Sequence, residues 1–176
     1  MAGLIVLMGP TGAGKSVQGD LLAQQLGGVH LSSGNLLRQD PVAARMIANG
    51  KLAPADEVER IMGEAIAEVE NEKVIILDGF PRTTSNLRWM DEELPKLGRS
   101  VEHVILIELD VATCIARLSI RDRADDSPAA VQEKLDAYEL STRPVVEHYQ
   151  KTGMLKRVDG RGSVESVRAL VRAAIS

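Results

Sequence analysis

The sequence predicts a three-layer α/β fold with a parallel sheet. Short apolar runs, as at residues 4–8, 74–77 and 104–107, alternate along the chain with longer segments whose apolar residues recur at helical spacing. The first run leads directly into a glycine-rich loop and a helical pattern, the strand, loop and helix order of a P-loop. In such folds ligands bind at the carboxyl ends of the strands, so we expect the functional residues there.

The individual elements follow from local patterns. Apolar runs predict strands at residues 4–8, 29–31, 74–78, 104–107 and 154–158. Helical spacing predicts helices at residues 17–26, 54–69, 83–94, 111–120, 128 to beyond 139, and 164–175. Pro54 and Pro128 suit a first helical turn, and Ser127 suits the N-cap before it. We expect a turn at Asn49-Gly50, and Pro144 to divide the long helical pattern in two.

Composition limits the class of protein. A chain of 176 residues fits one domain, and a formal net charge of -4 argues against a general nucleic-acid surface. No apolar run reaches the length of a membrane span, and no targeting segment is evident. The single cysteine, Cys114, excludes an internal disulfide and a cysteine-based structural zinc site. We therefore expect a cytoplasmic protein that binds neither membrane nor nucleic acid.

The glycine-rich loop, Gly9-Pro10-Thr11-Gly12-Ala13-Gly14-Lys15-Ser16, fits G-x-x-x-x-G-K-[ST]. Its glycines let the backbone curl so that N–H groups face phosphate oxygens, and the positive end of the following helix adds to that field. Lys15 supplies a full positive charge and Ser16 a hydroxyl for Mg²⁺. The loop predicts binding of a nucleoside triphosphate.

Further charged residues point to phosphoryl transfer. Asp78 ends a buried-strand pattern, where a carboxylate can hold Mg²⁺ directly or through water. Phosphoryl transfer depends on positioning and on charge placed at the moving group, which the bidentate arginine fork supplies well. The chain carries an ordered series of candidates: Arg38, Arg82, Arg117, Arg121 and Arg123.

These motifs together resemble the adenylate kinase family of nucleoside monophosphate kinases, nearly from end to end. Besides the P-loop, the matching segments are His30-Leu31-Ser32-Ser33-Gly34-Asn35-Leu36-Leu37-Arg38, Gly50-Lys51-Leu52-Ala53-Pro54, Leu77-Asp78-Gly79-Phe80-Pro81-Arg82 and Arg123-Ala124-Asp125-Asp126. The resemblance implies a five-stranded parallel sheet of order 2-3-1-4-5. It also implies a core of residues 1–31, 72–120 and 127–176, a helical monophosphate-binding segment at 32–71 and a minimal lid at 121–126.

The resemblance implies a role for each matching residue. The catalytic set is Lys15, Arg38, Arg82, Arg121, Arg123 and Lys134. The ATP site is Gly9, Gly12, Ala13, Gly14, Lys15, Ser16, Arg117 and Gly160. The monophosphate site is Ser33, Gly34, Arg38, Leu52, Val58, Gly79, Arg82 and Asn86. Ser16 and Asp78 would serve Mg²⁺, and Asp125 and Asp126 would orient the lid arginines.

Three departures from the family pattern carry consequences. Asn35 stands where the family has aspartate, and Lys134 where it usually has arginine, which loses the bidentate fork. Only Asp122 separates Arg121 from Arg123, so the lid is very short. Because a lid excludes water, we expect this chain to lose more phosphoryl groups to water than a lidded relative.

Two residues bear on which nucleoside monophosphate accepts the phosphoryl group. Ser33 keeps the hydroxyl of the adenylate type, whereas Asn86 is similar to the UMP/CMP kinase pattern, and an amide can pair with either base edge. We favour AMP, with UMP or CMP as the alternative, and expect a monomer. A P-loop kinase of a non-nucleotide acceptor would leave the Ser-Ser-Gly-Asn and Asp-Gly-Phe-Pro-Arg motifs unexplained. A catalytically weak nucleotide-binding regulator would bind ATP without turnover.

Overall fold

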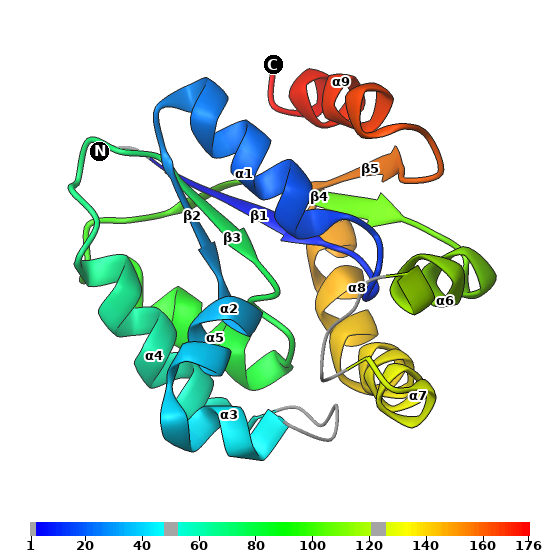
Figure 1. The fold of residues 1–176 in the computed structure, drawn as a ribbon. Helices are drawn as coiled ribbons and strands as arrows, with labels where there is room; N and C mark the ends of the chain where they lie inside the picture. Colours follow the sequence, from blue (N-terminus) through cyan, green and yellow to red (C-terminus); the bar gives the residue numbers. More distant parts are fainter. Residues whose placement is uncertain (1–2, 48–52, 121–125) are drawn as a thin grey trace.

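A computed structural model describes residues 3–47, 53–120 and 126–176. Within them a five-stranded parallel sheet has the order β2-β3-β1-β4-β5 (Figure 1), which confirms the predicted fold class and order. The strands are β1 (Leu4–Met8), β2 (Val29–Ser32), β3 (Ile75–Asp78), β4 (Val101–Glu108) and β5 (Leu155–Asp159). Strand β4 begins earlier than predicted because Glu102 and His103 interrupt the apolar pattern while still belonging to the strand.

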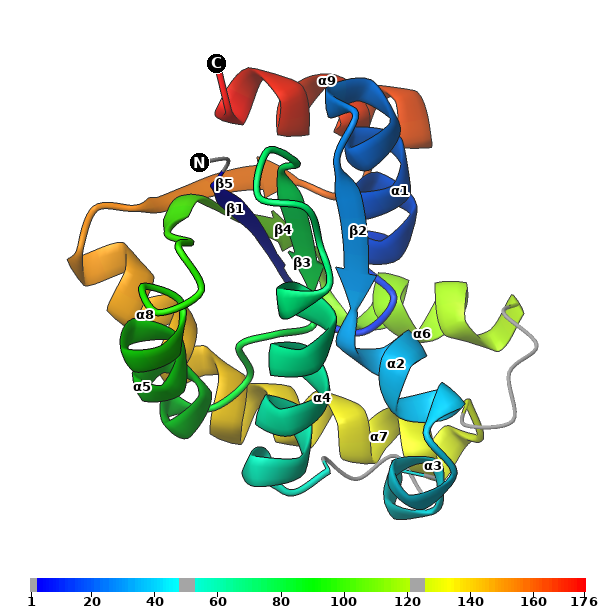
Figure 2. The same ribbon diagram turned by 90° about the vertical axis from the view of Figure 1, so that its left-hand side faces the viewer.

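Helices cover both faces of the sheet (Figures 1 and 2). Helices α1 (Lys15–Leu26) and α9 (Val164–Ala174) pack together on one face, over Ile5 and Leu7 of β1. The other face, which includes Leu4 and Val6, is covered by α4 (Ala55–Ala67), α5 (Thr84–Glu93) and α8 (Arg143–Lys151). Alternate residues of one strand thus enter two separate cores, which explains why β1 is apolar throughout.

The remaining helices lie at the carboxyl ends of the strands. Helices α2 (Ser33–Gln39) and α3 (Pro41–Ile47) lead from β2 towards α4, whereas α6 (Val111–Ile120) and α7 (Pro128–Ala137) follow β4. Figure 2 shows these two groups beyond the same end of the sheet. None of the helices in the described ranges has the length and apolarity that crossing a membrane requires.

Two local predictions are tested by the helices around α7. Ser127 caps α7, its hydroxyl accepting a hydrogen bond from the Ala130 amide at 3.3 Å. The long helical pattern divides as predicted, with Pro144 in the first turn of α8. The division itself is a π-helical turn, Tyr138–Thr142, which the sequence pattern did not reveal. The predicted turn at Asn49-Gly50 lies outside the described residues.

Candidate active site

The P-loop connects β1 to α1 and has the conformation that its glycines predict. Gly9, Gly12 and Gly14 all have positive φ angles, of 142°, 84° and 92°. A Cβ at Gly9 would lie 2.4 Å from the carbonyl oxygen of Ile107, so glycine is required there. Lys15 Nζ donates to the carbonyl oxygens of Gly9 and Pro10 at 2.8 and 2.9 Å, which keeps the ammonium group over the loop.

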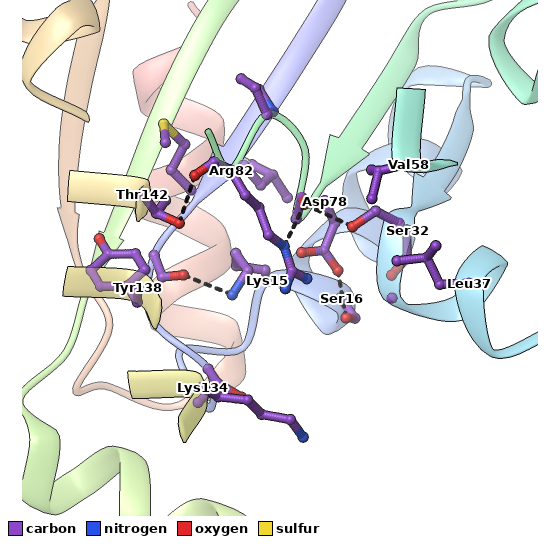
Figure 3. Close-up of a pocket in the computed structure, with 18 of the residues that line it drawn as sticks. Lys15, Ser16, Ser32, Leu37, Val58, Asp78, Arg82, Lys134, Tyr138 and Thr142 are labelled. Carbon is purple, nitrogen blue, oxygen red and sulfur yellow. Dashed lines mark hydrogen bonds between the residues drawn. The ribbon is translucent and has the colours of Figure 1, made fainter. Parts of the chain in front are cut away.

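Ser16 and Asp78 meet beside this loop, although 62 positions separate them in the chain. The Ser16 hydroxyl donates to Asp78 Oδ2 at 2.6 Å (Figure 3). His30 Nε2 lies 3.8 Å from the same oxygen, and its Nδ1 lies 2.7 Å from Asp20 Oδ1. Burial alone would raise the pKa of Asp78, but His30, the Lys15 charge and the Ser16 hydroxyl hold it well below its usual range. Asp78 is therefore a buried, ionised carboxylate.

The turn after β3 brings Arg82 towards Asp78. Arg82 Nε donates to the Gly79 carbonyl at 2.6 Å, and the Ser33 hydroxyl donates to the same oxygen at 2.7 Å. Burial lowers the pKa of Arg82, while Asp78 opposes and Arg38 adds to that effect, because all three charges lie near one another. Two guanidinium groups thus lie close to the end of the P-loop.

A cavity of about 300 Å³ joins these features. The predicted residues that line it are Lys15, Arg38, Arg82, Lys134, Gly9, Gly12, Gly14, Ser16, Arg117, Ser33, Gly34, Val58, Gly79, Asn86 and Asp78. They come from the P-loop and the start of α1, from α2, α4, the end of β3 and the turn after it, and from α5, α6 and α7. One cavity is therefore lined by a P-loop lysine and by two arginines, a set of cations that suits transfer between two phosphate groups.

Comparison with known proteins agrees with this geometry. A family model described as adenylate kinase matches residues 7–154. The chain belongs to the adenylate kinase family. Among its relatives are proteins named adenylate kinase from Prochlorococcus marinus, 32% identical over all of both chains, and from Thermus thermophilus, 35% identical over 97% of this chain and 96% of that one. A third, from Stenotrophomonas maltophilia, is 35% identical over 97% of this chain and 98% of its own.

Ala13 and Gly160, which the family pattern assigns to the ATP site, are not among the residues that line the cavity. The side chain of Ala13 is buried in the core, and its amide donates to the Pro10 carbonyl at 3.2 Å, so Ala13 shapes the loop. The Gly160 carbonyl accepts from Arg117 Nη2 at 2.9 Å, which ties the loop after β5 to α6. Their contact with ATP stays a prediction.

Lys134 is the one predicted lid cation that lies within the described residues. Its Nζ lies 3.0 Å from Asp126 Oδ1, a carboxylate that is almost fully buried. Lys134 lines the same cavity as Lys15 and Arg82, and Figure 3 shows its side chain set apart from theirs. Arg121, Arg123, Asp125 and Leu52 lie outside the described residues, and their roles stay predictions.

Sequence reasoning missed residues that only the fold brings to the cavity. Tyr138 and Thr142, both in the π-helical turn, line the cavity. The Thr142 hydroxyl donates to the Arg82 carbonyl at 3.1 Å, connecting the end of the π-helical turn to the Arg82 turn (Figure 3). Neither belongs to a recognisable motif. A π turn often marks a functional site, but it is visible only in coordinates.

Proposed function

We propose that this chain is an adenylate kinase, which reversibly transfers the γ-phosphoryl group of Mg·ATP to AMP and forms two ADP. The observation that carries the proposal is one cavity lined by Lys15 of the P-loop, by Asp78 and by the Arg38 and Arg82 guanidinium groups. A site that only binds Mg·ATP needs the P-loop lysine and the carboxylate. The two additional cations, the arginines, suit the phosphate of a second nucleotide.

Transfer would proceed in line, without a covalent enzyme intermediate or a catalytic base. P-loop amides and Lys15 would bind the ATP phosphates, and Arg38 and Arg82 would hold the acceptor phosphate facing them. The hydrogen bond from Arg82 to Gly79 fixes the direction of this side chain before substrate binds. Lys134, with Arg121 and Arg123, would add positive charge at the moving phosphoryl group.

The oxygen donors beside the P-loop suit Mg²⁺. Mg²⁺ usually binds through one or two protein oxygens while keeping phosphate and water ligands. Ser16 and Asp78 place a hydroxyl and an ionised carboxylate 2.6 Å apart, whereas the described residues contain no cluster of three or more histidine, cysteine or acidic side chains fit to hold a metal alone. Ser16 and Asp78 would hold the ion, which would neutralise phosphate charge.

The organisation of the chain is part of the proposal. Residues 1–31, 72–120 and 127–176 would form a stable core, residues 32–71 would bind the monophosphate, and residues 121–126 would be a minimal lid. We propose a monomer that acts in the cytoplasm. The short lid would allow measurable hydrolysis of ATP when no acceptor is present.

Initial rates with Mg·ATP and each of AMP, CMP, UMP and GMP test the proposal. AMP is expected to give the highest kcat/KM, and CMP or UMP ahead of AMP would make the chain a pyrimidine kinase.

Lys15→Ala and Arg82→Ala should each lower kcat/KM at least about 100-fold, as loss of a preorganised charge does. Arg88→Ala, an exposed arginine on α5, is the matched control. A loss below about tenfold at Arg82 would refute its placement. ATP binding without turnover would identify a regulator.

A further inference from the structure

The cavity contains a slot suited to a planar ring. Part of the cavity wall is apolar, formed by Leu37, Ile47, Ala53 and Val58. Two polar side chains, Ser33 and Asn86, interrupt these walls, and both are almost completely buried. An apolar slot with few polar groups is the usual form of a site for a heteroaromatic ring. On the proposed function, on which this inference rests, the ring is the base of the acceptor monophosphate.

The amide of Asn86 is held at both ends. Its Oδ1 accepts hydrogen bonds from the backbone N–H groups of Arg82 and Thr83 at 3.2 and 3.3 Å, the second of these within the capping box of α5. Its Nδ2 donates to Glu59 Oε1 on α4 at 2.9 Å. Turning the amide over would place its NH₂ group against two N–H donors and its oxygen against a carboxylate. The orientation is therefore fixed by three independent bonds.

This arrangement leaves Asn86 with one hydrogen-bonding capacity. Both lone pairs of Oδ1 and one hydrogen of Nδ2 are used, so the second N–H remains for a ligand. The Ser33 hydroxyl, by contrast, is held as an acceptor. Its hydroxyl hydrogen is donated to the Gly79 carbonyl at 2.7 Å, so its oxygen can only accept from a ligand. While the bond from Ser33 to Gly79 is kept, the slot thus offers one donor and one acceptor.

We propose that Glu59 determines base selection by holding Asn86 as a donor. Adenine and cytosine carry an amino donor beside a ring-nitrogen acceptor, which complements Ser33 and Asn86. This match requires the amino group to face Ser33 and the ring nitrogen to face Asn86. In the same placement, hypoxanthine, guanine and uracil would turn a carbonyl oxygen towards the Ser33 oxygen and an N–H group towards the Asn86 N–H group. The site therefore selects amino bases over oxo bases. Glu59 acts through Asn86 and is a positioning residue.

The test compares acceptors that differ only at this edge: AMP with IMP, and CMP with UMP. For the unmodified protein, kcat/KM for AMP should exceed that for IMP at least about 100-fold. The kcat/KM for CMP should likewise exceed that for UMP. Glu59→Leu should lower the AMP/IMP ratio at least about tenfold, chiefly through KM, with the KM for ATP unchanged. Glu59→Gln, whose carbonyl still accepts from Asn86, should keep the ratio within about threefold.

Two controls separate positioning from a structural effect. Glu64→Leu removes the same charge at an exposed position further along α4 and should leave the ratio unchanged. General loosening of α4 would raise the KM of every acceptor alike, and the ratio would not move. Trp89, the only tryptophan, packs against Gly63 of α4, so its fluorescence reports whether α4 remains folded in each variant.

Each outcome decides between the two proposals. If the unmodified protein uses IMP within about tenfold of AMP, or if Glu59→Leu keeps the wild-type ratio, the inference about Glu59 is wrong and the adenylate kinase activity stands. If no acceptor is turned over, the proposed function is wrong. Calorimetric titration with AMP and IMP still tests the inference in that case, because equal affinities, or no binding of AMP, would overturn it.

Discussion

Replacing Arg99 by methionine should destabilise this protein strongly without touching the active site. Arg99 follows α5 and is only 4% exposed. Its guanidinium donates to four backbone carbonyls between α4 and β3, those of Val69, Glu70, Asn71 and Lys73, at 2.8 to 3.3 Å. One side chain thus satisfies the peptide groups of a segment that no regular element pairs. Methionine fills a similar volume but donates no hydrogen bond.

The magnitude follows from which carbonyls can recover a partner. Glu70 and Asn71 are exposed, and water can replace the guanidinium there. The carbonyls of Val69 and Lys73 are on half-buried residues, and each lost bond to a charged donor is worth about 2 kcal/mol. The expected loss is about 4 kcal/mol, a large part of the roughly 5–15 kcal/mol of a typical protein. For a chain of this length it lowers Tm by about 8–16 °C.

Urea unfolding, followed by Trp89 fluorescence and by circular dichroism, measures this loss. Arg88→Met makes the same chemical change at an exposed position of α5 and should stay within about 0.5 kcal/mol of the unmodified protein. A loss below about 1.5 kcal/mol for Arg99→Met would show that the four carbonyls do not depend on the guanidinium.

Four further predictions test other parts of the structure. Lys134→Arg should raise kcat, because arginine restores a bidentate donor to phosphoryl oxygens; an unchanged kcat would place this side chain outside the reaction. ATP hydrolysis without acceptor should be measurable, and a rate negligible beside transfer would contradict the role given to the short lid. Cys114 is fully buried, and burial raises the pKa of its thiol, so a thiol reagent at pH 8 should label it only after unfolding; rapid labelling of the folded protein would contradict this. Burial also raises the pKa of Tyr138 to about 12, above its unfolded value near 10, so its contribution to stability is complete below pH 10 and is lost as the pH rises towards 12. Tyrosinate absorbance near 295 nm and urea unfolding at pH 9 and 11 measure this effect, which Tyr138→Phe should reduce.

The fold was predictable because its signals are local. The strand patterns, the P-loop glycines and the Ser127-Pro128 start of α7 depend on neighbouring residues. The structure has a strand at each predicted apolar run, positive φ angles at the loop glycines and an α7 that begins at Pro128. The sheet order came from the family resemblance, which the match over residues 7–154 confirms. The early start of β4 and the π turn were missed, because sheet pairing and an extra residue in a helical turn leave no periodic signal.

The sequence by itself predicted which residues would carry phosphate chemistry. The P-loop motif pointed to Lys15 and Ser16, the end of a buried strand pointed to Asp78, and the family resemblance implied the roles of Arg38 and Arg82. Tertiary structure decided which hydrogen bonds the side chains around these residues make. Asn86 could have paired with either base edge as an isolated amide, yet its bonds to α4 and to the Arg82 turn leave it one donor. The donors and acceptors of a side chain are occupied by partners that are distant in the sequence. Only folding brings Glu59 to Asn86 and Thr142 to Arg82.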